Sequence, residues 1–425
     1  MAWIGVLDCN NFFVSCERLF RPDLRTKPVV VLSSNDGCIV ARSQEIKDSG
    51  IPMGVPYFQV KDKLTKLGTT VFSSHFALYR DISRRVFAVM REELALVEQY
   101  SIDEGFFCVE HDPEGVAHRL KVRVEQAVGI PVSIGVAASK TQAKYVNQVA
   151  KKTTGVVVWS PKEWAAATSA IQLGELWGVG SRLALRYRAA DLVTVADVLA
   201  VDTQSQRALF GLPGARLQQE LRGQVAYPVT TQRSQQKSLM SSRSFARATT
   251  VYAEIADAVA YHVRQVAADL RAMQCGALSL RVSIRPSRHG AYALMGGSQE
   301  VTFSGPVSST VELLRAAATL LAAAYRPQVP YQKASVLVGQ IAPLATKTRS
   351  LFVPEESARN TELDAVVDAV NSRWGRVVLE QGRHTQKRQW QPAAQAVSPA
   401  YTTQWPAIAT AYATNVVEYT NDTCI

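Results

Sequence analysis

The sequence has few of the features that mark disulfide-linked or zinc-centred proteins. It contains no Cys-x-x-Cys pair, and its six histidines show no metal-ligand spacing. The six cysteines are scattered along the chain: Cys9, Cys16, Cys38, Cys108, Cys275 and Cys424. This pattern is typical of reduced thiols in a cytosolic protein, and it disfavours both a disulfide framework and a structural zinc site.

Long apolar runs are also missing. The segment from Leu313 to Tyr325 is rich in alanine, but it is short and carries Arg315, so we predict a core-facing helix there. The N-terminus has no basic stretch, and Asp8 interrupts its apolar run before a signal sequence could form. We therefore expect a cytoplasmic protein that does not bind a membrane.

What the sequence does have is length and positive charge. Its 425 residues are too many for one ordinary core and enough for several domains. The formal net charge is +11, which favours a polyanionic partner. A generically basic surface is the alternative, because net charge informs about association and not about fold.

Two adjacent carboxylates, Asp103 and Glu104, stand just before an apolar run that ends near Val109. The run predicts a strand, so the acidic pair lies where a sheet edge meets solvent. Burying these charges without partners would be costly. A bound Mg²⁺ ion would remove that cost, because it prefers oxygen ligands. A solvated acidic pair at a strand end is the alternative.

Asp8 stands in a very similar setting. Residues 3–7 predict a buried strand that ends at Asp8. Asn11 is expected to cap a following helix over residues 12–20. A carboxylate at the end of this strand adds a third acid to the pair at residues 103 and 104.

Three such acids could converge on two metal ions about 4 Å apart, which is the geometry of in-line phosphoryl transfer. One condition must hold. Neighbours in a regular strand point to opposite faces, so Asp103 and Glu104 can share a site only if the backbone turns or bulges there.

The motifs around these acids resemble those of the Y-family, or translesion, DNA polymerases. The family pattern is carried by Asp8-x-Asn10-x-Phe12-Phe13-x-Ser15-x-Glu17 and Ser101-Ile102-Asp103-Glu104. Three further stretches resemble the UmuC type, which comprises catalytic subunits of bacterial DNA polymerase V: Phe20-Arg21-Pro22-Asp23-Leu24, Ser34-Asn35-Asp36-Gly37-Cys38 and Ser398-Pro399-x-Tyr401-Thr402-Thr403-x-Trp405. The resemblance covers essentially the whole chain.

The resemblance implies a multidomain α/β and α+β fold, the right-hand polymerase architecture. Alternating strands and helices agree with an α/β palm. We expect a palm over 1–33 and 74–165, small fingers over 34–73, a helix-hairpin-helix thumb over 166–223, a linker over 224–236, an α+β little finger over 237–342 and a partly disordered UmuC-type region over 343–425. Within these, we predict a helix over 74–99, helices over 251–274, 310–325 and 362–374, and a short strand over 377–379.

Catalytic roles also follow from the resemblance. It implies that Asp8, Asp103 and Glu104 hold two Mg²⁺ ions, with the Cys9 carbonyl as a further ligand. Phe13 matches the steric gate that excludes the ribose 2′-hydroxyl, and Phe12 precedes it. A core aromatic is the alternative for Phe13.

The predicted nucleotide and DNA contacts are basic residues and glycines. Triphosphate candidates are Arg42, Lys47 and Lys151. DNA candidates are Lys140, Lys144, Gly178, Gly180 and Arg243; for the lysines a solvated helix face is the alternative. Leu351 and Phe352 resemble a degenerate sliding-clamp peptide, with an ordinary hydrophobic anchor as the alternative.

The implied function is error-prone, template-directed DNA synthesis in damage tolerance and SOS mutagenesis. The implied partners are primer-template DNA, deoxynucleotides, a processed UmuD-type dimer, a RecA filament and the sliding clamp, in the nucleoid. Two alternatives stay open: a catalytically silent DNA-binding or regulatory subunit, and a palm-fold nucleotide cyclase, which would need neither thumb nor little finger.

Overall fold

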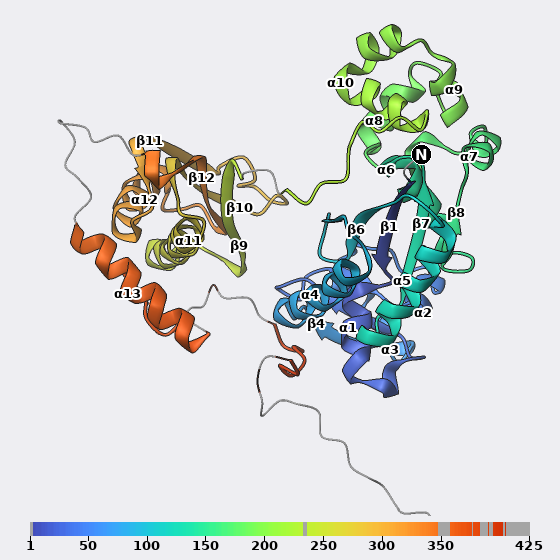
Figure 1. Ribbon diagram of the computed structural model, residues 1–425. Coiled ribbons are helices and arrows are strands. Elements are labelled where there is room, and N and C mark those ends of the chain that lie inside the picture. The colour runs from blue at the N-terminus through green and yellow to red at the C-terminus, as the bar shows by residue number, and fades with distance from the viewer. Residues whose placement is uncertain are drawn as a thin grey trace, which may run out of the picture. The chain divides into compact units, whose positions relative to one another are not determined.

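The computed structural model describes residues 3–232, 236–346, 358–375, 377–382, 390, 394–402 and 404. The chain forms two compact units (Figure 1). The N-terminal unit comprises residues 1–33, 37–233 and 395–425, and the C-terminal unit comprises 34–36 and 234–394. The predicted clamp residues Leu351 and Phe352 lie outside the described residues, as does the predicted disordered tail after Trp405.

A five-stranded sheet is the centre of the N-terminal unit. Its strand order is β5-β6-β1-β7-β8, and only the β7–β8 pair is parallel. The strands are β1 (Trp3–Cys9), β5 (Val97–Gln99), β6 (Glu104–Val109), β7 (Val132–Ala137) and β8 (Val156–Val158). Because β1 lies in the middle and is apolar on both faces, it is buried on both sides.

Helices cover both faces of this sheet. Even-numbered β1 residues such as Val6 pack with Val146 of α6, whereas Leu7 packs with Phe87 of α4 on the other face. The helices are α1 (Phe12–Phe20), α4 (Phe76–Glu93), α5 (Pro113–Val128) and α6 (Lys140–Ala150). The two-residue alternation of β1 therefore decides which helix each side chain meets.

A smaller three-stranded sheet has the order β3-β2-β4. It comprises β2 (Val29–Leu32), β3 (Ile39–Arg42) and β4 (Thr70–Ser73), with α2 (Gln44–Asp48), α3 (Tyr57–Lys66) and the short 3₁₀ helix η1 (Pro22–Leu24) nearby in the chain. Residues 29–32, which we place at the end of the palm, form the middle strand of this smaller sheet. Hydrophobic pattern predicts a strand without saying which sheet it joins.

The remainder of the N-terminal unit is helical. It has its own core around Trp164, Tyr187 and Phe210. The helices are α7 (Pro161–Ala167), η2 (Leu173–Glu175), α8 (Ser181–Arg188), α9 (Val195–Ala200) and α10 (Thr203–Leu221). Ser160 and Thr194 close capping boxes at the starts of α7 and α9, which explains where those helices begin.

The C-terminal unit is a four-stranded antiparallel sheet packed against two long helices. Its order is β11-β10-β12-β9. The elements are β9 (Ser238–Thr249), α11 (Tyr252–Ala272), β10 (Cys275–Pro286), β11 (Gly297–Val307), α12 (Thr310–Ala324), β12 (Tyr331–Pro343), η3 (Leu344–Thr346) and α13 (Ala358–Trp374). The predicted strand over 377–379 is wrong. These residues form no ladder, because the side chain of Asn371 binds their backbone.

Two other local predictions are corrected. The helix predicted over 74–99 stops at Glu93, and Val97–Gln99 form the edge strand β5. Asn11 does not cap α1 with its side chain; its backbone is left-handed, with φ 50°. Within the described ranges, no helix is both long and apolar enough to cross a membrane.

Candidate active site

Asp8 and Glu104 are direct neighbours across the central strand pair. Asp8 pairs in register with Glu104 of β6 and with Ser133 of β7. Even-numbered β1 residues face α6, so Asp8 points to that side, and Glu104 follows the same face as Phe106. The pairing brings two residues nearly 100 positions apart to one end of the sheet.

Asp103 joins them through a turn that ends the strand ladder. The backbone N–H groups of Tyr100 and Ser101 both donate to the Glu104 carbonyl, at 3.0 Å. The Ser101 hydroxyl donates to Asp103 Oδ1 at 2.7 Å and accepts from the N–H groups of Asp103 and Glu104. The Cys9 N–H donates to the Asp103 carbonyl at 2.9 Å. The turn that the sequence argument required is therefore present.

Lysines on or just after α6 neutralise part of this negative charge. Lys151 Nζ lies 2.6 Å from Asp8 Oδ1, and Lys144 forms an ion pair with Glu104. Each cation meets one carboxylate directly. The two ion pairs show that the site already attracts positive charge.

The compensation is incomplete. Burial and the neighbouring Glu104 carboxyl raise the pKa of Asp8 to about 7, although Lys151 acts against them. Burial also raises the pKa of Asp103, which the Ser101 hydroxyl opposes. Burial acts on Glu104 too, but hydrogen bonds with Asp8 and Lys144 hold its pKa below the ordinary value. Asp8 thus holds its charge at a cost that a nearby cation would remove.

Among the described residues, no three acidic, histidine or cysteine side chains are already arranged as a metal site. The three carboxylates instead contact lysine or serine side chains. The donor set nevertheless fits Mg²⁺, which prefers carboxylate oxygens, and the raised pKa of Asp8 is the sign of an acidic site short of positive charge.

A group of basic residues lies beside the acids. Burial and the nearby charges of Lys151 and Arg42 lower the pKa of Lys47, so the three cations act on one another. Arg42 donates to the Ile51 carbonyl, which fixes its guanidinium group. Mutually repelling cations at one place would favour a polyanionic ligand.

Phe13 stands in a cluster of aromatic rings. It stacks on Tyr79 of α4 with ring centroids 4.5 Å apart and planes 12° apart, and the Phe76 ring meets it edge-on at 5.8 Å. Phe13 is half-buried, whereas Phe12 is only 3 % exposed and lies in the core. The side chain of Phe12 therefore offers little surface to a nucleotide, and its predicted nucleotide contact stays a prediction.

Sequence reasoning missed the residues that support the cluster. Glu17 is fully buried, and the Tyr79 hydroxyl donates to its Oε1 at 2.7 Å. Glu17 follows Phe13 by one helical turn, so Tyr79 contacts both side chains on one face of α1. Glu17 stood in the motif, but its partner on α4 is 62 positions away and has no local signal.

The predicted DNA contacts divide into buried and exposed groups. Lys140 is only 4 % exposed and binds Glu98 at 2.6 Å, so it does not face DNA. The Lys144 ammonium group is taken by Glu104. Helical spacing places these two lysines together, but Lys140 is buried, whereas the DNA contact of Lys144 stays a prediction.

The other predicted DNA contacts are not excluded by burial. Gly178 has φ +87°, a conformation that favours glycine, and Gly180 precedes the first turn of α8. Arg243 is half-buried on β9, with its guanidinium group 5.4 Å from the ring centroid of Tyr261.

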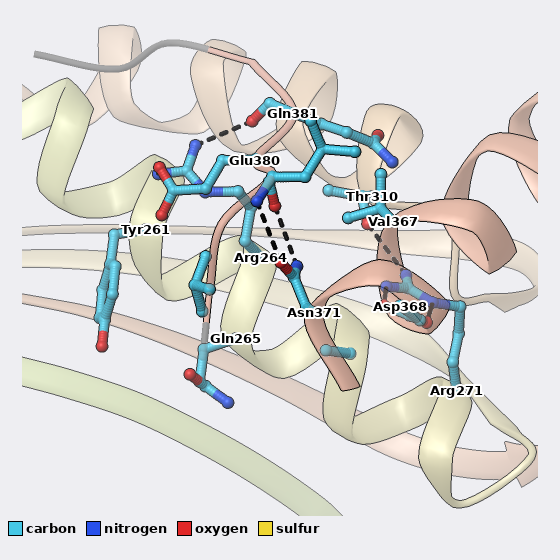
Figure 2. A pocket seen from close by; sticks show the side chains of 13 residues that line it. Tyr261, Arg264, Gln265, Arg271, Thr310, Val367, Asp368, Asn371, Glu380 and Gln381 are labelled. Carbon is cyan, nitrogen blue, oxygen red and sulfur yellow. Dashed lines mark hydrogen bonds and ion pairs between the residues drawn. The ribbon is translucent and has the colours of Figure 1, made fainter. Parts of the chain in front are cut away.

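A cavity of about 230 Å³ lies in the C-terminal unit, between α11 and the chain around α13 (Figure 2). Its charged groups bind protein atoms: the Arg264 guanidinium donates to the Gln381 carbonyl at 2.9 Å, and Arg271 binds Asp368. We interpret this cavity as a gap in the packing of α13 against α11. None of the three acids lines it.

The fold is that of a Y-family DNA polymerase. A Y-family DNA polymerase chimera superimposes with a TM-score of 0.68 at 19% sequence identity, over 81% of this chain and 100% of the chimera. Sequence profiles of the impB/mucB/samB family match residues 7–148, and those of its C-terminal domain match 236–351. A domain of unknown function matches 361–411.

Individual relatives give the same family. Protein UmuC of Salmonella typhimurium is 33% identical over 94% of this chain and 98% of its own length. Protein ImpB of the same organism is 32% identical over 94% and 97%. DNA polymerase IV 1 of Bacillus subtilis is 25% identical over 90% and 93%. The chain therefore belongs to the impB/mucB/samB family, the UmuC-type branch of the Y-family polymerases.

Proposed function

We propose that this chain is an error-prone translesion DNA polymerase that joins deoxynucleotides to a primer by a two-metal mechanism. The observation that carries the proposal is the meeting of Asp8, Asp103 and Glu104 at one end of the central sheet, beside cations. Family membership is the second support.

In this proposal, Asp8, Asp103, Glu104 and the Cys9 carbonyl would hold two Mg²⁺ ions, with Glu104 on the primer side and Cys9 on the triphosphate side. When bound, the ions supply Lewis acidity for the primer hydroxyl and the leaving pyrophosphate. With the ions bound, Lys151 and Lys144 would no longer be needed to balance the charges of Asp8 and Glu104. The triphosphate is bound by Lys151, Lys47 and Arg42. The two lysines supply point charges, whereas the arginine guanidinium group can form two parallel hydrogen bonds with a phosphate.

Phe13 acts as the steric gate. Its ring is held from one side by Tyr79, so it resists displacement by a ribose 2′-hydroxyl. DNA is bound by the thumb around Gly178 and Gly180 and by β9 of the little finger, where Arg243 lies. The proposed wider setting is SOS mutagenesis in the nucleoid, with a processed UmuD-type dimer, RecA filaments and the sliding clamp.

The experiment is primer extension across an abasic template with Mg²⁺, in the presence of a UmuD-type dimer and RecA filaments. Wild type should extend the primer and Asp103→Ala should not, while an exposed-site variant on α3, Asp62→Asn, should behave as wild type. Extension by neither wild type nor Asp62→Asn, despite tight DNA binding, would favour a silent regulatory subunit instead.

A further inference from the structure

The described end of the chain returns to the N-terminal unit. Residues 395–401, which we call the strap, belong by their contacts to the same unit as the acidic site. Ser73 N–H donates to the Ala396 carbonyl at 2.9 Å, and Ala396 N–H donates to the Ser73 hydroxyl at 3.0 Å. The strap is thereby fixed to the end of β4, immediately before α4.

Two side chains of the strap contact the helices that carry the aromatic cluster. Ser398 Oγ lies 3.0 Å from Nδ1 of His75, the residue that precedes α4. Tyr401 stacks on Phe20 of α1, with ring centroids 4.7 Å apart and planes 9° apart. The strap therefore contacts the last residue of α1 and the residue that precedes α4.

These are the parts of the fold that place the gate. Tyr79 and Phe76, which flank Phe13, both lie in the first turn of α4, and the Tyr79 N–H donates to the His75 carbonyl at 3.1 Å. Glu17 links the same groups. Burial raises the pKa of the Glu17 carboxyl, and the hydrogen bond from the Tyr79 hydroxyl partly offsets this effect.

We infer that the strap is a positioning element for nucleotide selection: Ser398 and Tyr401 hold the first turn of α4 against α1, so that Tyr79 keeps the Phe13 ring in place. The inference rests on the proposed gate role of Phe13. It assigns a role to part of the domain of unknown function that spans residues 361–411.

The test compares incorporation of ribonucleotides and deoxyribonucleotides by the full chain. Ser398→Ala and Tyr401→Ala should each raise the ribonucleotide-to-deoxyribonucleotide ratio of kcat/KM by about 3- to 10-fold, the scale of one hydrogen bond or one stacked ring pair. The deoxyribonucleotide kcat should stay near that of wild type. A merely structural role would instead lower incorporation of both substrates together.

Conservative variants and a matched control sharpen the test. Ser398→Thr keeps the hydroxyl and Tyr401→Phe keeps the ring, so both should retain the wild-type ratio. Val397→Ala changes a strap side chain that is 46% exposed, and it should also leave the ratio unchanged.

Phe13→Ala separates the two possible failures. An unchanged ratio in Phe13→Ala would overturn the gate role and the strap proposal with it. A ratio that rises in Phe13→Ala but not in Ser398→Ala or Tyr401→Ala would leave the gate in place and overturn the strap proposal. A rise in Val397→Ala equal to that in Ser398→Ala would also overturn it.

Discussion

Clustered charges are balanced in one unit of the molecule and unbalanced in the other. In the C-terminal unit, Arg271 binds Asp368 with both ends of its guanidinium fork, at 2.7 and 2.8 Å, and also contacts the buried Asp364. In the N-terminal unit, three carboxylates share a site in which Asp8 has a pKa of about 7. The first arrangement is satisfied and anchors α13. The second is short of positive charge and suits a bound cation.

The largest expected effect follows from removing an acid of the second arrangement. Asp8→Asn should lower the rate of nucleotide incorporation by at least about 10²- to 10³-fold, the scale of losing one group that stabilises the transition state. The same variant should unfold at a temperature equal to or above that of wild type, because a buried charge has been removed. Single-turnover extension and thermal unfolding measure the two results. A variant that is clearly less stable would contradict the proposed shortage of positive charge.

Removing the arginine from the charge network of the C-terminal unit should instead lower the stability of the protein. Arg271→Met leaves Asp364 and Asp368 without their guanidinium partner, so it should destabilise the C-terminal unit by about 3–5 kcal/mol. Denaturant unfolding measures the loss, and Arg288→Met, at an exposed site in the same unit, is the control. A loss no larger than that of the control would show that the Arg271 network does not stabilise the unit.

These contrasts separate what the sequence could predict from what it could not. Periodicity predicted α1, α11 and α12 closely, and the apolar run before Asp8 predicted β1. The meeting of the acids depended on a turn at Ser101, whose hydrogen bonds are made by groups that look ordinary in a sequence. The motif identified the catalytic candidates, but it gave no physical account of that turn.

The local sequence pattern does not predict contacts between residues that are far apart in the sequence. The helix predicted over residues 74–99 contains Tyr79, but helical spacing does not indicate that the Tyr79 hydroxyl binds Glu17. The strap resembled a family stretch, yet short irregular segments carry no periodicity that indicates their partner. Helical spacing does not reveal burial either: Lys140 and Lys144 both lie on α6, but Lys140 is buried and bound to Glu98.

The stability of the C-terminal unit should depend on pH because of the buried histidine His262. Burial, aided by the charges of Arg243 and Lys333, lowers the pKa of His262 to about 4. The unfolded chain therefore binds the proton more readily, and the contribution of this group to stability is complete above about pH 6.5 and is lost as the pH falls toward 4.

Between pH 7 and pH 4.5 that loss should amount to about 2 kcal/mol for the C-terminal unit. Urea unfolding at pH 7 and pH 4.5 measures it. His262→Gln should flatten the dependence, and His289→Gln, at an exposed site, should not. The same slope in wild type and His262→Gln would rule out this histidine as the cause.

The smallest effect concerns exposed and buried lysines near the acids. Lys152 is exposed, so Lys152→Gln should reduce the slope of log DNA affinity against log salt by about 1. Lys140→Met should leave the slope unchanged, because Lys140 is buried against Glu98. Both slopes are obtained from DNA affinities measured between about 50 and 200 mM salt, where phosphate contacts make the affinity fall steeply. Equal slopes for the two variants would contradict the distinction.

The most direct test of a cation site at the three acids is the effect of Mg²⁺ on the thermal stability of the protein. Thermal unfolding of the N-terminal unit, followed without DNA or nucleotide, should shift upward as Mg²⁺ is added, by about 2–4 °C for each kcal/mol of binding. Asp103→Asn should lose most of this shift and Asp62→Asn should retain it. Equal shifts in wild type and Asp103→Asn, or no shift in wild type, would contradict a metal site formed by Asp8, Asp103 and Glu104.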